Sequence, residues 1–100
     1  HELGSREIED VLYVVREALS NAIRHGHPTR VAVDLRQTTE HTAITIQDNG
    51  VGFDVEQVKP NMGTITLRTR AARLGADLTV LSVPGMGTTV RLVLPRPASA

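Results

Sequence analysis

The sequence predicts an α+β fold, a two-layer α/β sandwich in which a mostly antiparallel sheet carries its helices on one face. Three observations lead to this prediction: a long amphipathic segment opens the chain, an alternating pair of segments follows it, and a shorter helical segment precedes a second alternating pair. Hairpins between neighbouring segments favour antiparallel pairing over a parallel βαβ design. The 100 residues are enough for one such domain and too few for two.

The first predicted helix begins at Ser5, which can cap the first turn, and Glu7 is favourable near the positive end of the helix dipole. Gly26 and Pro28 are predicted to end this helix, because proline cannot continue it and glycine favours a left-handed cap. Apolar residues at helical spacing form a stripe that is predicted to face the core. They are Ile8, Val11, Leu12, Val15, Leu19, Ala22 and Ile23.

Two hairpins account for the four predicted strands. In the first, residues 31–35 and 44–46 alternate between apolar and polar, with a polar turn at residues 38–41. In the second, residues 78–83 and 88–94 flank a turn that contains Pro84 and two glycines.

The segment between the two hairpins loses both periodicities. Asp48 to Gly63 is predicted to be a loop, since it contains Pro60 and several glycines. Leu67 and Ala71 then predict a short helix that ends at Gly75. The loop is the least regular part of the chain and the first place to look for a site.

Composition excludes several classes of function. Eleven Lys and Arg balance eleven Asp and Glu, so the chain lacks the basic field expected of a protein that binds nucleic acid or an anionic membrane. The absence of cysteine excludes disulfides and thiolate metal sites. No apolar run is long enough to span a bilayer, and the first residues do not resemble a signal peptide. We expect a soluble, cytoplasmic domain, which is compatible with a membrane-anchored parent protein.

Three polar side chains share one narrow sector of the first helix, opposite the apolar stripe: Glu17, Asn21 and Arg24. A carboxylate, an amide oxygen and a guanidinium on successive turns can polarise a nucleophile, complete the shell of a hard metal and hold phosphate oxygens. The simpler interpretation is a solvated helix face. The helix alone leaves both interpretations open.

Two strand ends are predicted to direct polar groups into the interior. Asp48 has the strand parity of Ile44 and Ile46, and Thr88 has that of Val90. A buried carboxylate requires a donor, and the exocyclic amine of a purine is one. The alternatives are an ordinary Asp-Asn-Gly turn and a threonine that is simply a good strand former.

Glycines mark two further positions. Gly50 and Gly52 allow the backbone to approach a ligand closely. Gly63 opens the second predicted helix, where free amides and the helix dipole favour an anion.

Three blocks of the sequence, in this order, resemble conserved blocks of the GHKL ATPase superfamily. They are Glu17-Ala-Leu-Ser-Asn21-Ala-Ile-Arg24-His25, Asp48-Asn-Gly50-Val-Gly52-Phe and Pro84-Gly85-Met-Gly87-Thr88-Thr-Val. The stretches Arg70-Ala-Ala-Arg-Leu-Gly75 and Ser82-Val-Pro-Gly look most like sensor histidine kinases that partner NarL-type response regulators. The resemblance covers nearly the whole chain.

The resemblance implies the Bergerat ATP-binding fold, with the nucleotide between sheet and helices under a lid at residues 53–62. ATP and Mg²⁺ are the implied cofactors. On the phosphate side, the resemblance implies that Asn21 ligates Mg²⁺, that Glu17 assists phosphoryl transfer, and that Arg24 and His25 contact the phosphates. On the adenine side, it implies that Asp48 binds the amino group, that Gly50 and Gly52 shape the pocket, and that Thr88 supports the base through a water. Gly63 is expected near the phosphates.

The same resemblance implies that residues 1–100 form the catalytic ATP-binding domain of an ATP-dependent protein-histidine kinase. The family's first strand would lie before His1, so the chain looks like an excised domain. The phosphate would pass to a histidine on a separate dimerisation domain of the same kinase, and then to a response regulator. By itself the chain is expected to bind ATP and to phosphorylate itself little. Two alternatives are an anti-sigma-factor serine kinase of the same fold and a non-catalytic nucleotide-sensing or interaction module.

Overall fold

A computed structural model describes residues 5–52 and 62–95, and these residues form two helices, one π-helical turn and four strands. The order of elements is the predicted one. Their bounds are α1 Ser5–Asn21, η1 Ala22–Gly26, β1 Val31–Gln37, β2 His41–Asp48, α2 Met62–Arg73, β3 Asp77–Val83 and β4 Gly87–Pro95.

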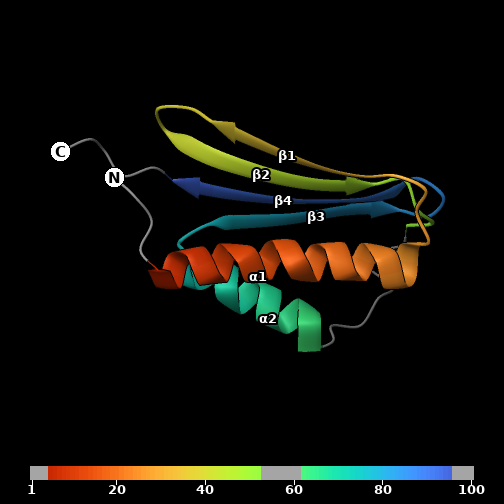
Figure 1. The fold of residues 1–100 in the computed structure, drawn as a ribbon, viewed down its shortest axis with the longest axis horizontal. Helices are drawn as coiled ribbons and strands as arrows, with labels where there is room; N and C mark the ends of the chain where they lie inside the picture. Colours follow the sequence, from red (N-terminus) through yellow and green to blue (C-terminus); the bar gives the residue numbers. More distant parts are fainter. Residues whose placement is uncertain (1–4, 53–61, 96–100) are drawn as a thin grey trace.

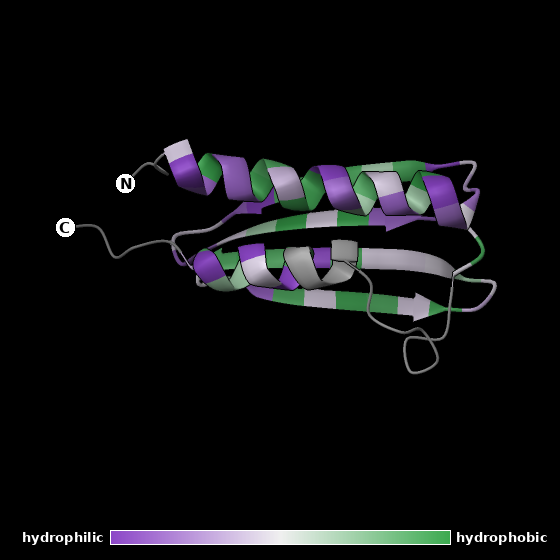
Figure 2. Cartoon of the chain, turned by 90° about the horizontal axis from the view of Figure 1, so that it is seen from below, coloured by the Kyte–Doolittle hydropathy of each residue, from purple (hydrophilic) through white to green (hydrophobic). Residues whose placement is uncertain are grey.

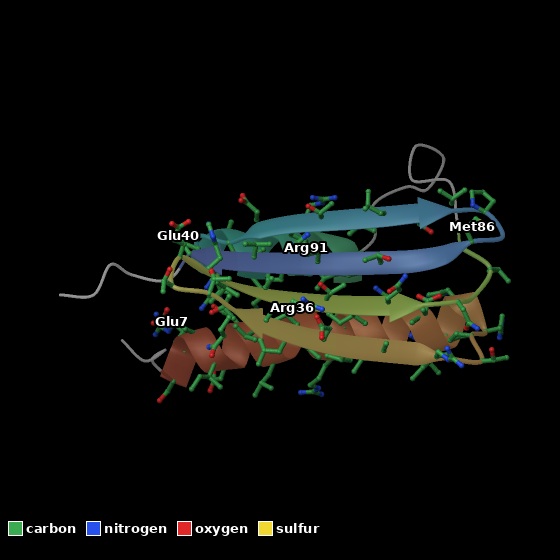
Figure 3. All side chains as sticks on the ribbon, turned by 90° about the horizontal axis from the view of Figure 1, so that it is seen from above. Glu7, Arg36, Glu40, Met86 and Arg91 are labelled. Carbon is green, nitrogen blue, oxygen red and sulfur yellow. The ribbon has the colours of Figure 1, made fainter. Side chains whose placement is uncertain are left out.

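The four strands form one antiparallel sheet in the order β1-β2-β4-β3. Both helices lie on the same face of this sheet (Figure 1), so the predicted two-layer α+β architecture is confirmed. The two hairpins meet where β2 pairs with β4 in the centre of the sheet. The other face carries charged side chains such as Arg36 and Arg91, which point away from the helices (Figure 3).

The core lies between the helices and the central strands, and its described buried residues are all aliphatic. Apolar residues alternate with polar ones along the strands (Figure 2), as expected for a sheet with one buried face. Val14 of α1 and Leu92 of β4 are completely buried. The remaining buried members of the core are Ala18, Ile44, Ile46, Leu67, Ala71, Val90 and Leu94.

Helix α1 packs with part of the predicted apolar stripe, since Val11, Val15 and Leu19 are partly buried against the core, and also with a neighbouring side that the stripe does not include. The buried positions along this side are Asp10, Val14 and Ala18 of α1 and Ala22 of η1, which are spaced four residues apart. Ile8, Leu12 and Ile23 are exposed instead. The small side chains of the two alanines leave room for a close approach to the sheet, and this side of the helix therefore faces inward.

The end of the first helix departs from regular α geometry. Ala22–Gly26 form a π-helical turn, and His27, not the predicted Gly26, has the left-handed conformation with φ 46°. π-helical turns redirect the side chains that they carry. Arg24 and His25 therefore leave the helix in directions that an ideal α-helix would not give.

Strand β1 is an edge of the sheet that the helices leave largely uncovered. Val33 and Leu35 pair with the buried Ile46 and Ile44 of β2, yet they are 53% and 61% exposed.

Among the described residues, no helix is both long enough and apolar enough to cross a membrane.

Candidate functional site

The predicted site lies where β2 ends and β4 begins. Asp48 is the last residue of β2 and pairs directly with Thr88 near the start of β4, so the two side chains lie on the face that carries the helices. Asp48 is only 7% exposed and Thr88 is half-buried. The inward orientation that strand parity predicts for both residues is confirmed.

The Asp48 carboxylate has unused capacity for hydrogen bonds. Its Oδ1 atom accepts a hydrogen bond of 2.7 Å from the Gly50 amide. Within residues 5–52 and 62–95, no hydrogen bond to Oδ2 is found. An ionised carboxylate accepts about four hydrogen bonds, so this side chain can take an N–H donor from a ligand without giving up its contact with Gly50.

Three glycines bring the surrounding segments into backbone contact. A Cβ atom on Gly50 would collide with the Gly26 carbonyl, one on Gly52 with the Val83 carbonyl, and one on Gly87 with the Asp48 carbonyl. Gly52 and Gly87 also have positive φ angles of 66° and 85°. The close approach at these glycines is thus between segments of the protein, and the predicted contact of Gly50 and Gly52 with a ligand remains a prediction.

Asn49 holds the end of β2 to the segment that follows the π-helical turn. Its Oδ1 atom accepts hydrogen bonds from the amides of Thr29 at 3.0 Å and Arg30 at 2.9 Å, and its Nδ2 atom donates to Thr29 Oγ1 at 2.8 Å. The sequence alone predicts only a turn-forming role for Asn49. Its partners lie about twenty residues earlier in the chain, and no local signal identifies them.

Ser82 is a second residue that sequence reasoning missed. Its Oγ atom lies 2.8 Å from Thr88 Oγ1 and donates to the Gly87 carbonyl at 3.2 Å. Ser82 has the strand parity of Leu78 and Val80, a signal that would have placed it beside Thr88. The hydroxyl pair orients Thr88 beside Asp48.

The polar side chains of the first helix do converge. Arg24 Nη2 donates to Asn21 Oδ1 at 3.3 Å and lies 3.8 Å from Glu17 Oε1. The Glu17 side chain is mostly buried, whereas that of Arg24 is 59% exposed. Arg24 thus has donors available for an anion. His25 is exposed, and among the described residues its side chain does not join this group.

Gly63 lies in the first turn of α2, as predicted, where backbone amides lack intrahelical partners. The predicted lid, residues 53–62, lies outside the described residues except for Met62, which opens α2.

The donor set fits a magnesium nucleotide. Among the described residues, no three His, Cys, Asp or Glu side chains form a metal cluster. Magnesium bound to a nucleotide takes most of its ligands from phosphate and water, so one amide oxygen such as Asn21 Oδ1 is a sufficient protein contribution. The buried Asp48 carboxylate matches an amino group, and Arg24 matches phosphate oxygens.

Comparisons with known proteins point to one family. The chain matches the model of the family described as histidine kinase-, DNA gyrase B- and HSP90-like ATPase over residues 7–98. It is 38% identical over 90 residues to the sensor protein VraS of Staphylococcus saprophyticus and of Staphylococcus aureus, an alignment that covers 88% of this chain and 26% of each relative.

Two solved structures share the fold. The histidine kinase domain of the Erythrobacter litoralis EL346 blue-light activated histidine kinase superposes with a TM-score of 0.80 at 26% identity, covering 90% of this chain and 45% of that one. A structure of that blue-light activated histidine kinase superposes with a TM-score of 0.77 at 27% identity, covering 93% of this chain and 31% of that one.

Proposed function

The chain belongs to the family of histidine kinase-, DNA gyrase B- and HSP90-like ATPases, and on that premise we propose that it binds Mg-ATP and donates the γ-phosphate to a histidine on a separate dimerisation domain. It matches sensor histidine kinases within that family. The domain would comprise residues 1–100, with a lid at 53–62. Bound Mg-ATP supplies the phosphoryl group and its activating charge.

The pairing of Asp48 with Thr88 carries the proposal. A carboxylate on a strand end accepts the purine amino group, and the neighbouring threonine hydroxyl, oriented by Ser82, supports the base through a water. Guanine presents a carbonyl oxygen where adenine presents an amine, so a carboxylate at this point selects adenine.

The phosphate side rests on Glu17, Asn21 and Arg24. Asn21 Oδ1 is a neutral oxygen ligand for Mg²⁺, and the Arg24 guanidinium and the amides at Gly63 neutralise phosphate charge. His25, at the end of the π-helical turn, adds a second donor. Glu17 is proposed to polarise the attacking group, since its carboxylate is mostly buried and lies within reach of Arg24. The chain's contribution is therefore positioning and charge neutralisation.

The chain spans about a quarter of the length of the curated relatives that it matches, so its partners are proposals. We propose an acceptor histidine on a dimerisation domain of the same kinase, a NarL-type response regulator downstream, and a cytoplasmic location. The exposure of Val33 and Leu35 supports a further strand or a partner segment at the β1 edge.

Labelling from γ-labelled ATP tests the proposal. The full chain is mixed with a purified histidine-containing dimerisation domain or with an anti-anti-sigma protein. We expect label on the histidine domain alone and little on the chain itself. Label on the anti-anti-sigma protein would instead indicate the serine kinase alternative, and nucleotide binding without transfer to either would indicate the sensing module. With Glu17→Gln, transfer should fall while ATP binding persists, and unchanged transfer would refute the role of Glu17.

A further inference from the structure

Asp10 has a charge that the proposed chemistry does not use. It lies on the buried side of α1, and its side chain is only 3% exposed. Asp10 and Asp48 are the two buried charged residues of the part of the chain that the structure describes. A buried carboxylate is unfavourable unless it is paired, so the partners of Asp10 show what it does.

Both partners come from α2. Arg70 Nη1 donates to Asp10 Oδ1 at 2.8 Å, and Arg73 Nε lies 3.5 Å from Oδ2. The Arg70 guanidinium also lies 4.6 Å from the centroid of the Tyr13 ring, one turn further along α1. Helix α1 therefore supplies a carboxylate and an aromatic face, and α2 supplies two guanidinium groups from adjacent turns.

This cluster fixes the orientation of the two helices relative to each other more strictly than apolar packing alone. The described buried side chains of α2 are Leu67 and Ala71, one of them a single methyl group. Apolar contacts tolerate rotation and sliding of a helix, whereas a paired carboxylate penalises any position in which it loses its partners. The ion pairs thus define how α2 is rotated and how far it is shifted along α1.

The position of α2 matters because its first turn contains Gly63. Arg70 lies seven residues beyond Gly63, which corresponds to about 10 Å along the helix axis. A helix moves as a rigid rod over this length, so a change at Arg70 and Arg73 displaces the amides at the other end.

We propose that Asp10 is a positioning residue for the phosphate side of the site: through Arg70 and Arg73 it fixes α2 so that the amides at Gly63 meet the phosphates. This inference rests on the proposed function. It requires that loss of the Asp10 charge weakens binding of the phosphates more than binding of the adenine, since Asp48 and Thr88 lie on the sheet and do not depend on α2.

Calorimetric titration of the full chain with Mg-ATP and with adenosine tests the proposal. Asp10→Asn preserves the volume of the side chain and removes its charge. We expect the affinity for ATP to fall about tenfold and that for adenosine to change less than about twofold. Asp34→Asn is the matched control, because it disrupts an ion pair of 2.9 Å with Arg36 on the exposed strand β1, and it should leave both affinities unchanged.

A second variant covers the case in which Asp10→Asn does not fold. Arg73→Gln removes the longer contact and leaves the pair of Asp10 with Arg70 in place. We expect a loss of ATP affinity of about threefold, with adenosine binding retained. Equal losses for ATP and adenosine, or no loss for ATP, would overturn the role of Asp10 alone. Failure of the unaltered chain to bind ATP would overturn the proposed function itself.

Discussion

The two buried carboxylates of this protein lie in contrasting surroundings. Asp10 has a guanidinium partner for each of its oxygens, whereas Asp48 gives one oxygen to the Gly50 amide and has no described partner for the other. The first arrangement joins two helices, and the second leaves a strong acceptor beside Thr88. The difference shows that burial of a charge does not by itself identify a binding site. Incomplete pairing within the chain is the more informative observation.

The largest expected effect concerns the backbone that surrounds Asp48. Gly87→Ala places a methyl group against the Asp48 carbonyl at a positive φ of 85°. We expect a loss of unfolding free energy of about 3 kcal/mol, from the unfavourable φ and the clash together.

Gly85→Ala separates these two causes. Gly85 has a similar φ of 82°, but nothing lies within 4 Å of its Cβ position. Urea denaturation should show a loss of only about 1 kcal/mol for this variant. Equal losses for the two alanine variants would mean that the close contact with Asp48 contributes nothing.

Asp48→Asn should separate binding from stability. The asparagine retains an Oδ1 acceptor for the Gly50 amide but replaces Oδ2 with a donor that repels the purine amine. We expect affinity for ATP to fall roughly 30- to 100-fold, as for the loss of a charged hydrogen bond, with stability changed by about 0.5 kcal/mol or less. Calorimetry and urea denaturation measure the two quantities. A large loss of stability would show that Asp48 is, like Asp10, a structural carboxylate.

In contrast to Asp48→Asn, Asp10→Asn should clearly lower the stability of the fold. Breaking a fully buried ion pair costs about 3–5 kcal/mol, and because Arg70 and Arg73 are partly exposed we expect about 2 kcal/mol here. The urea midpoint measures it. An unchanged midpoint would mean that the ion pairs of Asp10 with the two arginines contribute nothing to stability.

Ser82→Ala should have the smallest effect. It removes the hydroxyl that lies 2.8 Å from Thr88 Oγ1, so we expect adenosine affinity to fall about fivefold, equivalent to one neutral hydrogen bond. Thr79→Ala, on the exposed face of the same strand, is the control. Indistinguishable affinities for the two variants would exclude a role for Ser82 in orienting Thr88.

The sequence predicts the two carboxylates unequally, for a physical reason. A strand has a period of two, so the alternation through Ile44 and Ile46 predicts that Asp48 faces inward, and the structure agrees. The apolar stripe of α1 is broad, and the side that packs is decided by the fit of Ala18 and Ala22 to the sheet. The local sequence therefore does not predict the burial of Asp10, since its partners lie sixty or more residues away on another helix.

The hydrogen bonds between the loops around Asp48 also have a consequence for their motion. Val51 donates to the Gly26 carbonyl at 2.9 Å and accepts from Gly85 at 2.6 Å, so three segments from distant parts of the chain share one residue. Opening on either side breaks one of the two hydrogen bonds that hold the three segments together at Val51. We expect the amide protons of Val51 and Gly85 to exchange with deuterium at a common opening free energy, as one cooperative unit. The turn at Gly85, although exposed, should be as slow to exchange as the buried end of β2.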